Sequence, residues 1–346
     1  MLDNGNEEEQ QQQMQEILIC ADVWLGIFDF LSPFNVGQIM ALISDRLNVL
    51  VDVHFKSREW SLGSLQIRRV IGGNGAQIVK HPGEQILPIP QGPLPSKVIG
   101  FKEIKISYVD QTVIEFLQRF RRLFDSSGTN VDIDTSINQS RSLGVIWRKI
   151  WPLVNDNIYS IILDFSQFEC LRQFSPAILR NCAKLRSIGS YGLFPEFPAE
   201  DNAGASPGQA MAKWLLTPRG DGLPKFLCCV LHSEGMERLK GAFVNASEPI
   251  NFIISFWFDK NVESFELKNN WTGERLTFRQ MDEVDRLLVR CPIRREEDKW
   301  AKWEEEAIKL QWSRQWNRRI VIDFNDWDIG DGMVDANDEG PSEPTN

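Results

Sequence analysis

Several features that mark common protein classes are scarce or missing in this 346-residue sequence. Lysine and arginine (38) are outnumbered by aspartate and glutamate (48), and the net charge of −10 has the wrong sign for binding nucleic-acid phosphates or anionic lipid. No run of about 20 apolar residues is present, and the acidic, glutamine-rich N-terminus lacks the features of a secretory signal. We therefore expect a cytoplasmic or nuclear protein that contacts neither nucleic acid nor membrane.

Clusters of metal-ligating or redox-active residues are also missing. The six cysteines include no CxxC pair, which argues against zinc-ribbon and thioredoxin chemistry. Cys228 and His232 are close in sequence, but residues four apart on a strand are separated by about 13 Å, too far for a thiolate–imidazole pair. We predict no metal and no cofactor, and we expect the cysteines to behave as small buried apolar residues.

One short motif has a catalytic interpretation. Residues 204–208 (GASPG) match G-x-S-x-G, the nucleophile elbow of α/β-hydrolases. Pro207 argues against an elbow because it pushes the preceding residue toward extended backbone. The same residues also describe a helix start, with Ser206 as N-cap and Gln209 completing a capping box. A non-catalytic protein is favoured, and a serine hydrolase acting through Ser206 remains a remote alternative.

Composition and pattern divide the chain into six segments. Five prolines between residues 82 and 95 predict an extended connector, and eight acidic residues without a basic one from Asp323 onward predict a solvated tail. The predicted segments are 1–16 (disordered polar tail), 17–62 (small helical module), 63–97 (Gly/Pro-rich connector), 98–249 (α/β repeat region), 250–316 (antiparallel meander and C-terminal helix) and 317–346 (acidic tail).

Short apolar runs recur through the region 98–249. The first four begin at Ile104, Val131, Ile161 and Arg186, with spacings of 27, 30 and 25 residues that are typical of leucine-rich-repeat solenoids. Alternating apolar and polar residues after Ile104 and Val131 leave one sheet face polar, unlike the strands of a doubly wound sheet. We expect an α+β multidomain protein with an irregular leucine-rich-repeat-like solenoid, closed by an antiparallel meander and a final helix.

That final helix is expected at about residues 296–316. Its apolar residues recur at heptad spacing: Trp300, Trp303, Ala307 and Leu310. We expect Trp300 and Trp303 to pack on the meander, whereas Trp312 and Trp316 are candidates for contact with a partner.

The first helix of the N-terminal module is apolar over most of its circumference. Asp22, Gly26 and Asp29 form a narrow polar stripe at i, i+4 and i+7. A helix of this kind is normally buried on several sides, yet a unit of about 45 residues has few elements that could bury it. Either the body or a partner protein should cover it.

Three stretches of the module resemble an F-box. Residues 19–33 (ICADVWLGIFDFLSP) resemble its opening, L-P-x-E-[VL]-L-x-x-I-F-x-x-L-x-P, although Cys20 stands where the family has proline. Residues 39–47 (IMALISDRL) are similar to its second helix, and residues 50–60 (LVDVHFKSREW) look like the closing segment of F-box-like proteins of plant-parasitic nematodes. The runs 193–198, 217–224 and 265–270 resemble the same expanded family.

This resemblance implies a substrate-receptor subunit of a cullin–RING ubiquitin ligase. A three-helix F-box-like module would bind a Skp-family adaptor, and the α/β body would bind a target protein. Large apolar anchors dominate such interfaces, and Trp24 and Phe28 should project from one helix face as i, i+4 neighbours. The expected adaptor-binding residues are Val23, Trp24, Ile27, Phe28, Leu31, Pro33, Ile39, Leu42 and Ile43. The alternative is a scaffold or effector protein in which a degenerate F-box is only a structural cap.

Overall fold

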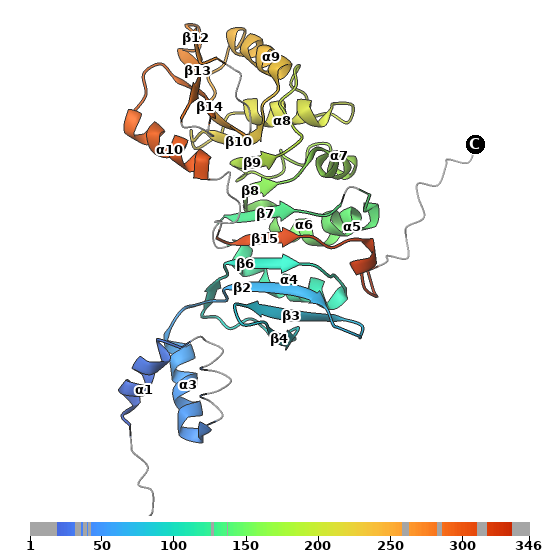
Figure 1. Ribbon diagram of the computed structural model, residues 1–346, viewed down its shortest axis with the longest axis vertical. Helices are drawn as coiled ribbons and strands as arrows, with labels where there is room; N and C mark the ends of the chain where they lie inside the picture. The colour runs from blue at the N-terminus through green and yellow to red at the C-terminus, as the bar shows by residue number, and fades with distance from the viewer. Residues whose placement is uncertain are drawn as a thin grey trace, which may run out of the picture. The chain divides into compact units, whose positions relative to one another are not determined.

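The computed structural model contains two compact units, Met1–Trp60 and Ser61–Asn346 (Figure 1). The predicted tail 1–16, the candidate sites Pro33, Ile39 and Leu42, and Trp312 and Trp316 lie outside the described residues. The structure describes residues 19–31, 36, 40, 43–125, 128–136, 138–257, 263–281, 286–309 and 317–333.

The N-terminal unit is built around helices α1 (Ala21–Phe28) and α3 (Asp45–Ser57). The hydroxyl of Ser44 accepts a hydrogen bond from the Leu47 N–H and so caps α3. The unit has a small core of its own, whose buried members are Phe28, Val36, Leu47 and Val51. Most of the predicted second helix lies outside the described residues, so the three-helix expectation stays a prediction.

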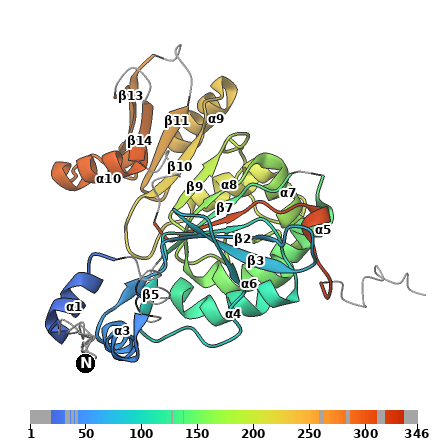
Figure 2. The same ribbon diagram turned by 60° about the horizontal axis from the view of Figure 1, so that its bottom comes forward.

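The larger unit is organised by a mixed sheet of 13 strands (Figures 1 and 2). The spatial order is β12-β13-β14-β11-β10-β9-β8-β7-β15-β6-β2-β3-β4. In chain order the strands are β2 (Ser64–Arg69), β3 (Ala76–His81), β4 (Gln85–Pro88), β6 (Glu103–Ile106), β7 (Thr129–Ile133), β8 (Ile158–Ile162), β9 (Ser187–Ser190), β10 (Lys225–Val230), β11 (Phe252–Trp257), β12 (Phe265–Asn269), β13 (Glu274–Gln280), β14 (Arg286–Pro292) and β15 (Arg319–Ile322). Short strands β1 (Trp60–Ser61) and β5 (Val98–Gly100) lie outside this sheet.

Helices connect the parallel strands from β6 to β11. Strands β7 to β11 are parallel neighbours in chain order. Crossovers between parallel strands are right-handed as a rule, and crossovers that all run in one direction along the sheet then put their helices on one face. Figure 2 shows α4 and α6 on the same side of the sheet. These helices are α4 (Gln111–Asp125), α5 (Ser140–Val145), α6 (Trp151–Val154), α7 (Phe165–Phe174), α8 (Pro207–Leu216) and α9 (Ser233–Val244), with helical turns η2 (Ile146–Ile150), η3 (Asn155–Asn157) and η5 (Asp326–Asp328).

The alternation read from the sequence produces two different sheet faces. Ile104 and Ile106 are fully buried, whereas the Lys105 side chain between them is exposed. This alternation buries one face of β6, whereas β9 is buried on both faces and β10 and β14 are buried over nearly all of their residues, so the expectation of one polar face is wrong for those strands. The prediction of a mixed α/β architecture is confirmed, and the sheet does not close into a barrel.

The expected connector at residues 63–97 is instead part of the sheet. Strand β2 pairs in parallel with β6 and antiparallel with β3, which pairs with β4. The sequence GGNG forms the turn between β2 and β3, where Gly72 and Gly75 adopt positive φ. The prediction was wrong because Leu65, Ile67 and Ile78 form short apolar strands whose signal the glycines and prolines around them obscured.

The expected acidic tail at residues 317–346 is wrong as far as Met333. Strand β15 lies between β6 and β7 and pairs in parallel with both. Beyond it, Phe324 is fully buried, and Gly330 packs so closely on Tyr108 that a side chain there would collide with the phenol oxygen. The prediction missed strand β15 because its four residues, Arg-Ile-Val-Ile, are followed directly by an acidic segment whose composition is typical of a solvated tail.

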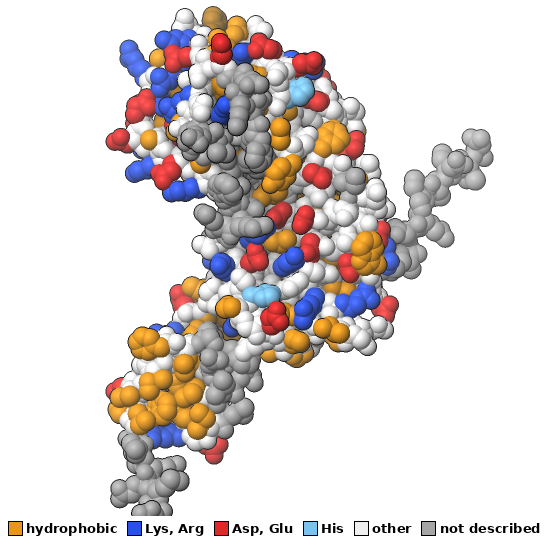
Figure 3. Space-filling model, viewed as in Figure 1, with side chains coloured by type: hydrophobic (Ala, Val, Ile, Leu, Met, Phe, Trp, Pro, Cys, Tyr) orange, Lys and Arg blue, Asp and Glu red, His pale blue; other side chains and the backbone are white. Residues whose placement is uncertain are grey.

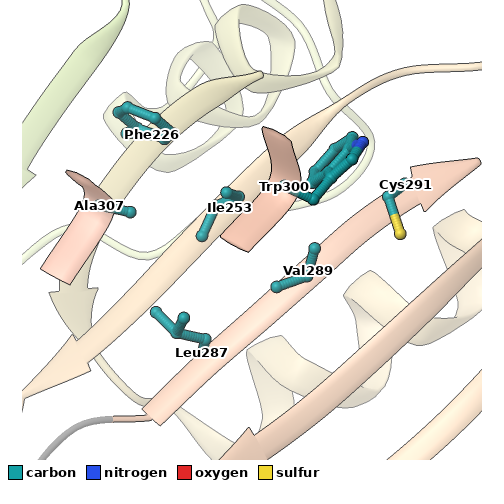
Figure 4. Packing of buried hydrophobic residues seen from close by; sticks show 7 residues of the cluster. All are labelled: Phe226, Ile253, Leu287, Val289, Cys291, Trp300 and Ala307. Atoms are coloured by element: carbon teal, nitrogen blue, oxygen red, sulfur yellow. The ribbon is translucent and has the colours of Figure 1, made fainter. Parts of the chain in front are cut away.

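The antiparallel strands expected after residue 250 are present. Strand β14 pairs antiparallel with β11 and β13, and β13 pairs with β12. Helix α10 (Glu297–Lys309) packs on this part of the sheet, with Trp303 and Ile308 at the margin of the cluster. The expectation that Trp300 and Trp303 pack on the meander is confirmed. Figure 4 shows the buried cluster, which comprises Phe226, Ile253, Leu287, Val289, Cys291, Trp300 and Ala307.

Replacing Trp300 by alanine should lower the free energy of unfolding of the larger unit by about 3–5 kcal/mol, because a buried indole leaves a cavity. Trp271, at the turn after β12, is 84% exposed. Trp271→Ala is therefore the matched control and should change stability by less than about 0.5 kcal/mol. Urea unfolding followed by circular dichroism measures both, and equal losses would contradict the packing of α10.

Removing residues 317–346 should unfold or strongly destabilise the larger unit, because β6 and β7 both lose the backbone partners that β15 supplies. The control ends the chain at Met333 and removes a segment with little apolar content. We expect its thermal midpoint to match that of the full chain. A stable, fully folded protein lacking residues 317–346 would refute the central role of β15.

Candidate functional site

The outer face of α1 exposes three large apolar side chains. Val23, Ile27 and the following Phe30 are 53%, 37% and 91% exposed. Their spacing of four and three residues places them along one helix face, turned away from the buried Phe28. Figure 3 shows hydrophobic side chains gathered on the N-terminal unit. Large exposed apolar surfaces of this kind mark interaction sites.

The predicted adaptor-binding residues divide between the surface and the unit's own core. Val23, Ile27 and Ile43 are exposed. Trp24 and Leu31 are half-buried against the core, and Phe28 is completely buried within it. The expectation that Trp24 and Phe28 project together toward a partner is therefore wrong for Phe28, because the helix turns that position inward.

Phe30 is the exposed residue that the expected set omitted. Its position three residues after Ile27 continues the row that begins at Val23, so helical phase alone could have identified it. Helix α3 adds Val49 and Val53, which are also exposed and lie one turn apart. The N-terminal unit thus carries exposed apolar residues on both of its described helices.

A buried histidine joins α3 to α1. His54 is almost fully buried, with its ring centroid 5.4 Å from that of Phe28 and 5.0 Å from that of Trp60. Its Nδ1 lies 3.8 Å from Oδ1 of Asp29, whose other oxygen pairs with Arg58 at 2.6 Å. Burial lowers the pKa of His54, although the Asp29 carboxylate acts in the opposite direction. This site holds a neutral imidazole inside an aromatic cluster.

In the larger unit, the polar face of the sheet carries linked ion pairs. Arg319 of β15 pairs with Glu103 of β6 at 3.0 Å and with Asp132 of β7. Lys105 pairs with Asp323 at 2.7 Å on the same face. Burial raises the pKa of Asp132 against the opposing effect of Arg319. The face is therefore polar and largely charge-compensated.

Ser206 caps the N-terminus of α8. Its hydroxyl accepts a hydrogen bond from the Gln209 N–H, and the Gln209 side chain accepts one from the Ser206 N–H. The hydroxyl also donates to Glu196 at 2.5 Å. The predicted helix start with a capping box is confirmed. His232 likewise caps α9, because its Nδ1 accepts a hydrogen bond from the Gly235 N–H.

No disulfide joins the six cysteines, all of which are among the described residues, and most of them are buried. Cys182, Cys228, Cys229 and Cys291 are buried, as expected, whereas Cys20 is exposed and Cys170 is half-buried. Burial raises the pKa of the Cys182 thiol to about 12. Burial also raises the pKa of the Cys229 thiol, so Cys182 and Cys229 are protonated at neutral pH.

Lys225 is a buried lysine that the sequence pattern did not single out. The Lys225 ammonium donates to the Trp214 carbonyl in the last turn of α8 and lies 4.9 Å from the centroid of the Trp214 ring. Burial lowers its pKa to about 7. Its hydrogen bond to the end of a helix gives it a structural role.

Comparison with protein-family models, with curated proteins and with solved structures finds no match to this chain. Among the described residues, no helix combines the length and apolarity needed to cross a membrane.

Lowering the pH from about 7.5 to about 5.5 should weaken the N-terminal unit. The folded pKa of His54 lies below its ordinary value of 6.5, so protons bind preferentially to the unfolded form and stability is lost as pH falls through about 6.5. Hydrogen exchange of the α3 amides, corrected for the intrinsic effect of pH, should report this loss.

The control for this titration is His54→Phe, which retains a ring among the aromatic neighbours and removes the ionisable group. We expect the pH dependence of α3 exchange to disappear in this variant. The same pH dependence in both proteins would assign it to other groups.

Proposed function

We propose that this chain is a substrate-receptor subunit of a cullin–RING ubiquitin ligase. Its N-terminal unit would act as an F-box-like module that binds a Skp-family adaptor, while the larger unit would bind a target protein. The observation that carries the proposal is the row of exposed apolar residues formed by Val23 and Ile27 of α1 and by Phe30 just after it, in the stretch that resembles the opening of an F-box.

The arrangement of α1 supports binding of a partner. The unit buries Phe28 in its own core, so the row Val23–Ile27–Phe30 is not needed to hold α1 against α3. Leaving this row in water forgoes roughly 25 cal/mol for each Å² of apolar surface that could be buried. An apolar surface of a partner would recover that free energy, and exposed anchors of this size dominate interfaces.

The larger unit supports the role of a target receptor. Strands β7 to β11 follow one another in parallel, and the crossover rule places their helices on a single face, an arrangement compatible with a leucine-rich-repeat-like solenoid. Polar side chains lie on the neighbouring strands β6 and β15, where Lys105 pairs with Asp323 and Arg319 pairs with Glu103. A polar sheet face of this kind suits a protein target whose surface offers matching charges.

Replacing either Val23 or Ile27 by aspartate should reduce capture of a purified Skp-family adaptor by the full chain at least about 100-fold, because a carboxylate would be desolvated against an apolar surface. Asn48→Asp adds the same charge at an exposed polar position of α3 and should leave capture unchanged. Binding is measured by surface plasmon resonance with immobilised adaptor.

Hydrogen exchange of α3 should be the same in all three variants, since each substituted side chain lies at the surface. Unchanged capture by Ile27→Asp would show that α1 is not the docking face. Absence of binding by the unsubstituted chain would refute the adaptor proposal and favour the scaffold or effector with a degenerate F-box.

A further inference from the structure

A cavity of about 290 Å³ lies in the larger unit between α4, strands β2 to β4 and the proline-rich segment that follows β4. The strands contribute Leu65, Ile78 and Leu87, and α4 contributes Phe116 and Phe120. The proline-rich segment supplies Pro90, Gly92, Pro93, Leu94 and Pro95. Figure 2 shows α4 beside β2 and β3, the elements that form two of its walls.

The lining is apolar apart from two cations. Lys80 and Arg119 line the cavity, and no Asp or Glu is among its described lining residues. Within the described part of the chain, neither cation lies within ion-pair distance of a carboxylate. Concave, mostly apolar sites with a few polar groups are the usual form of small-molecule sites.

Lys80 occupies an unusual position on its strand. It pairs with Leu65 across β2 and β3, and the next pair on the same face is Ile67 with Ile78. All three of these neighbours are buried apolar residues. Lys80 therefore points toward the face that α4 covers, where an apolar residue would be expected. Lys80 is half-buried, and burial lowers the pKa of its ammonium.

Arg119 is only partly satisfied by the protein. Its Nη2 donates to the Pro90 carbonyl at 2.9 Å, whereas its Nε is buried and has no hydrogen-bond partner. A buried N–H without an acceptor is costly. A carboxylate can accept from the guanidinium and from a nearby ammonium through separate oxygens.

We propose that this cavity binds a small amphipathic monocarboxylate of the medium-chain fatty-acid type, with its alkyl chain between α4 and the β2–β4 strands and its carboxylate between Lys80 and Arg119. The apolar lining accounts for the chain, and the two cations without an acidic partner account for the head group. This inference is independent of adaptor binding by the N-terminal unit.

The test titrates the full chain with hexanoate, octanoate and decanoate by isothermal titration calorimetry. Affinity should rise about fourfold for each added methylene until the cavity is filled. Decan-1-ol, which has the same chain without the charge, should bind at least about tenfold more weakly than decanoate. Equal affinity for decanoate and decanol, or tighter binding of decyl phosphate, would overturn the assigned head group.

Substitutions then locate the site. Lys80→Met and Arg119→Met should each weaken decanoate binding about tenfold while leaving decanol binding unchanged. Arg122→Met is the matched control, because Arg122 also holds the proline-rich segment, through the Pro95 and Ser96 carbonyls, but does not line the cavity. Equal weakening by Arg122→Met would show that the effect comes from the segment and would overturn the proposed contact.

A fourth variant tests the apolar part of the site. Leu94→Trp places a larger side chain in the proline-rich wall and should weaken decanoate and decanol alike. Circular dichroism checks that the variant is folded. Saturable decanoate binding that is unaffected by Leu94→Trp, or no saturable binding to the full chain, would refute the cavity as the binding site.

Discussion

The central sheet of the larger unit depends on a strand from the far end of the chain. Strands β6 and β7 are successive parallel strands, yet they do not pair with each other, because β15 lies between them and bonds to both. The Arg319 side chain repeats this bridge by contacting Glu103 on one side and Asp132 on the other. Without β15, two rows of backbone groups in the middle of the sheet would lose their partners.

This topology has a consequence for folding. Arg319 contacts Glu103 across 216 residues of chain. Contacts of such separation slow folding, because the chain loses the entropy of loop closure before the contact contributes any stabilising free energy. The sheet cannot be completed until almost the whole chain is present. The segment after β15 reinforces the arrangement, since the Asp326 carboxylate accepts from the backbone and the hydroxyl of Ser142 at the start of α5.

Buried charges fix the end of the sheet that contains β13 and β14. Arg290 of β14 and Glu274 of β13 pair at 2.7 Å with both side chains almost completely buried. Glu304 of α10 is also buried and pairs with Arg279 and Arg295. Such pairs add little net stability, but removing one partner is costly, so they favour one register and one helix position over alternatives. The charges position α10 over an apolar cluster that supplies the burial energy.

The N-terminal unit is governed by a different limit, the small number of buried side chains among its described residues. The core that these residues show, Phe28, Val36, Leu47 and Val51, contacts one face of α1 and one face of α3. The apolar residues that remain outside are the basis of the proposed adaptor docking. This core also disfavours a buried charge. His54 lies among aromatic rings, and burial lowers the pKa of its imidazole, which favours the neutral form.

Local pattern was sufficient for features that depend on nearby residues. The alternation around Lys105 correctly predicted the burial pattern of β6, and the capping box at Ser206 predicted the start of α8. Heptad spacing placed Trp300 and Trp303 on the packed side of α10. These features follow from periodicity and from hydrogen bonds over three residues, which the sequence by itself determines.

The tertiary structure alone decided which segments meet. Strand β15 contains only three apolar residues in a row, Ile320–Ile322, and such a short run has no local property that distinguishes a central strand from part of a polar tail. The strands that contain Leu65 and Ile78 were missed because turn-forming glycines and prolines lie close to them in sequence. Helical periodicity showed that α1 is apolar nearly all round, but only packing against α3 placed Phe28 inside and left Ile27 and Phe30 outside. Strand order, burial of a chosen helix face and the environment of Lys80 arise from contacts between distant residues, and the free energy of those contacts is not contained in any short stretch of sequence.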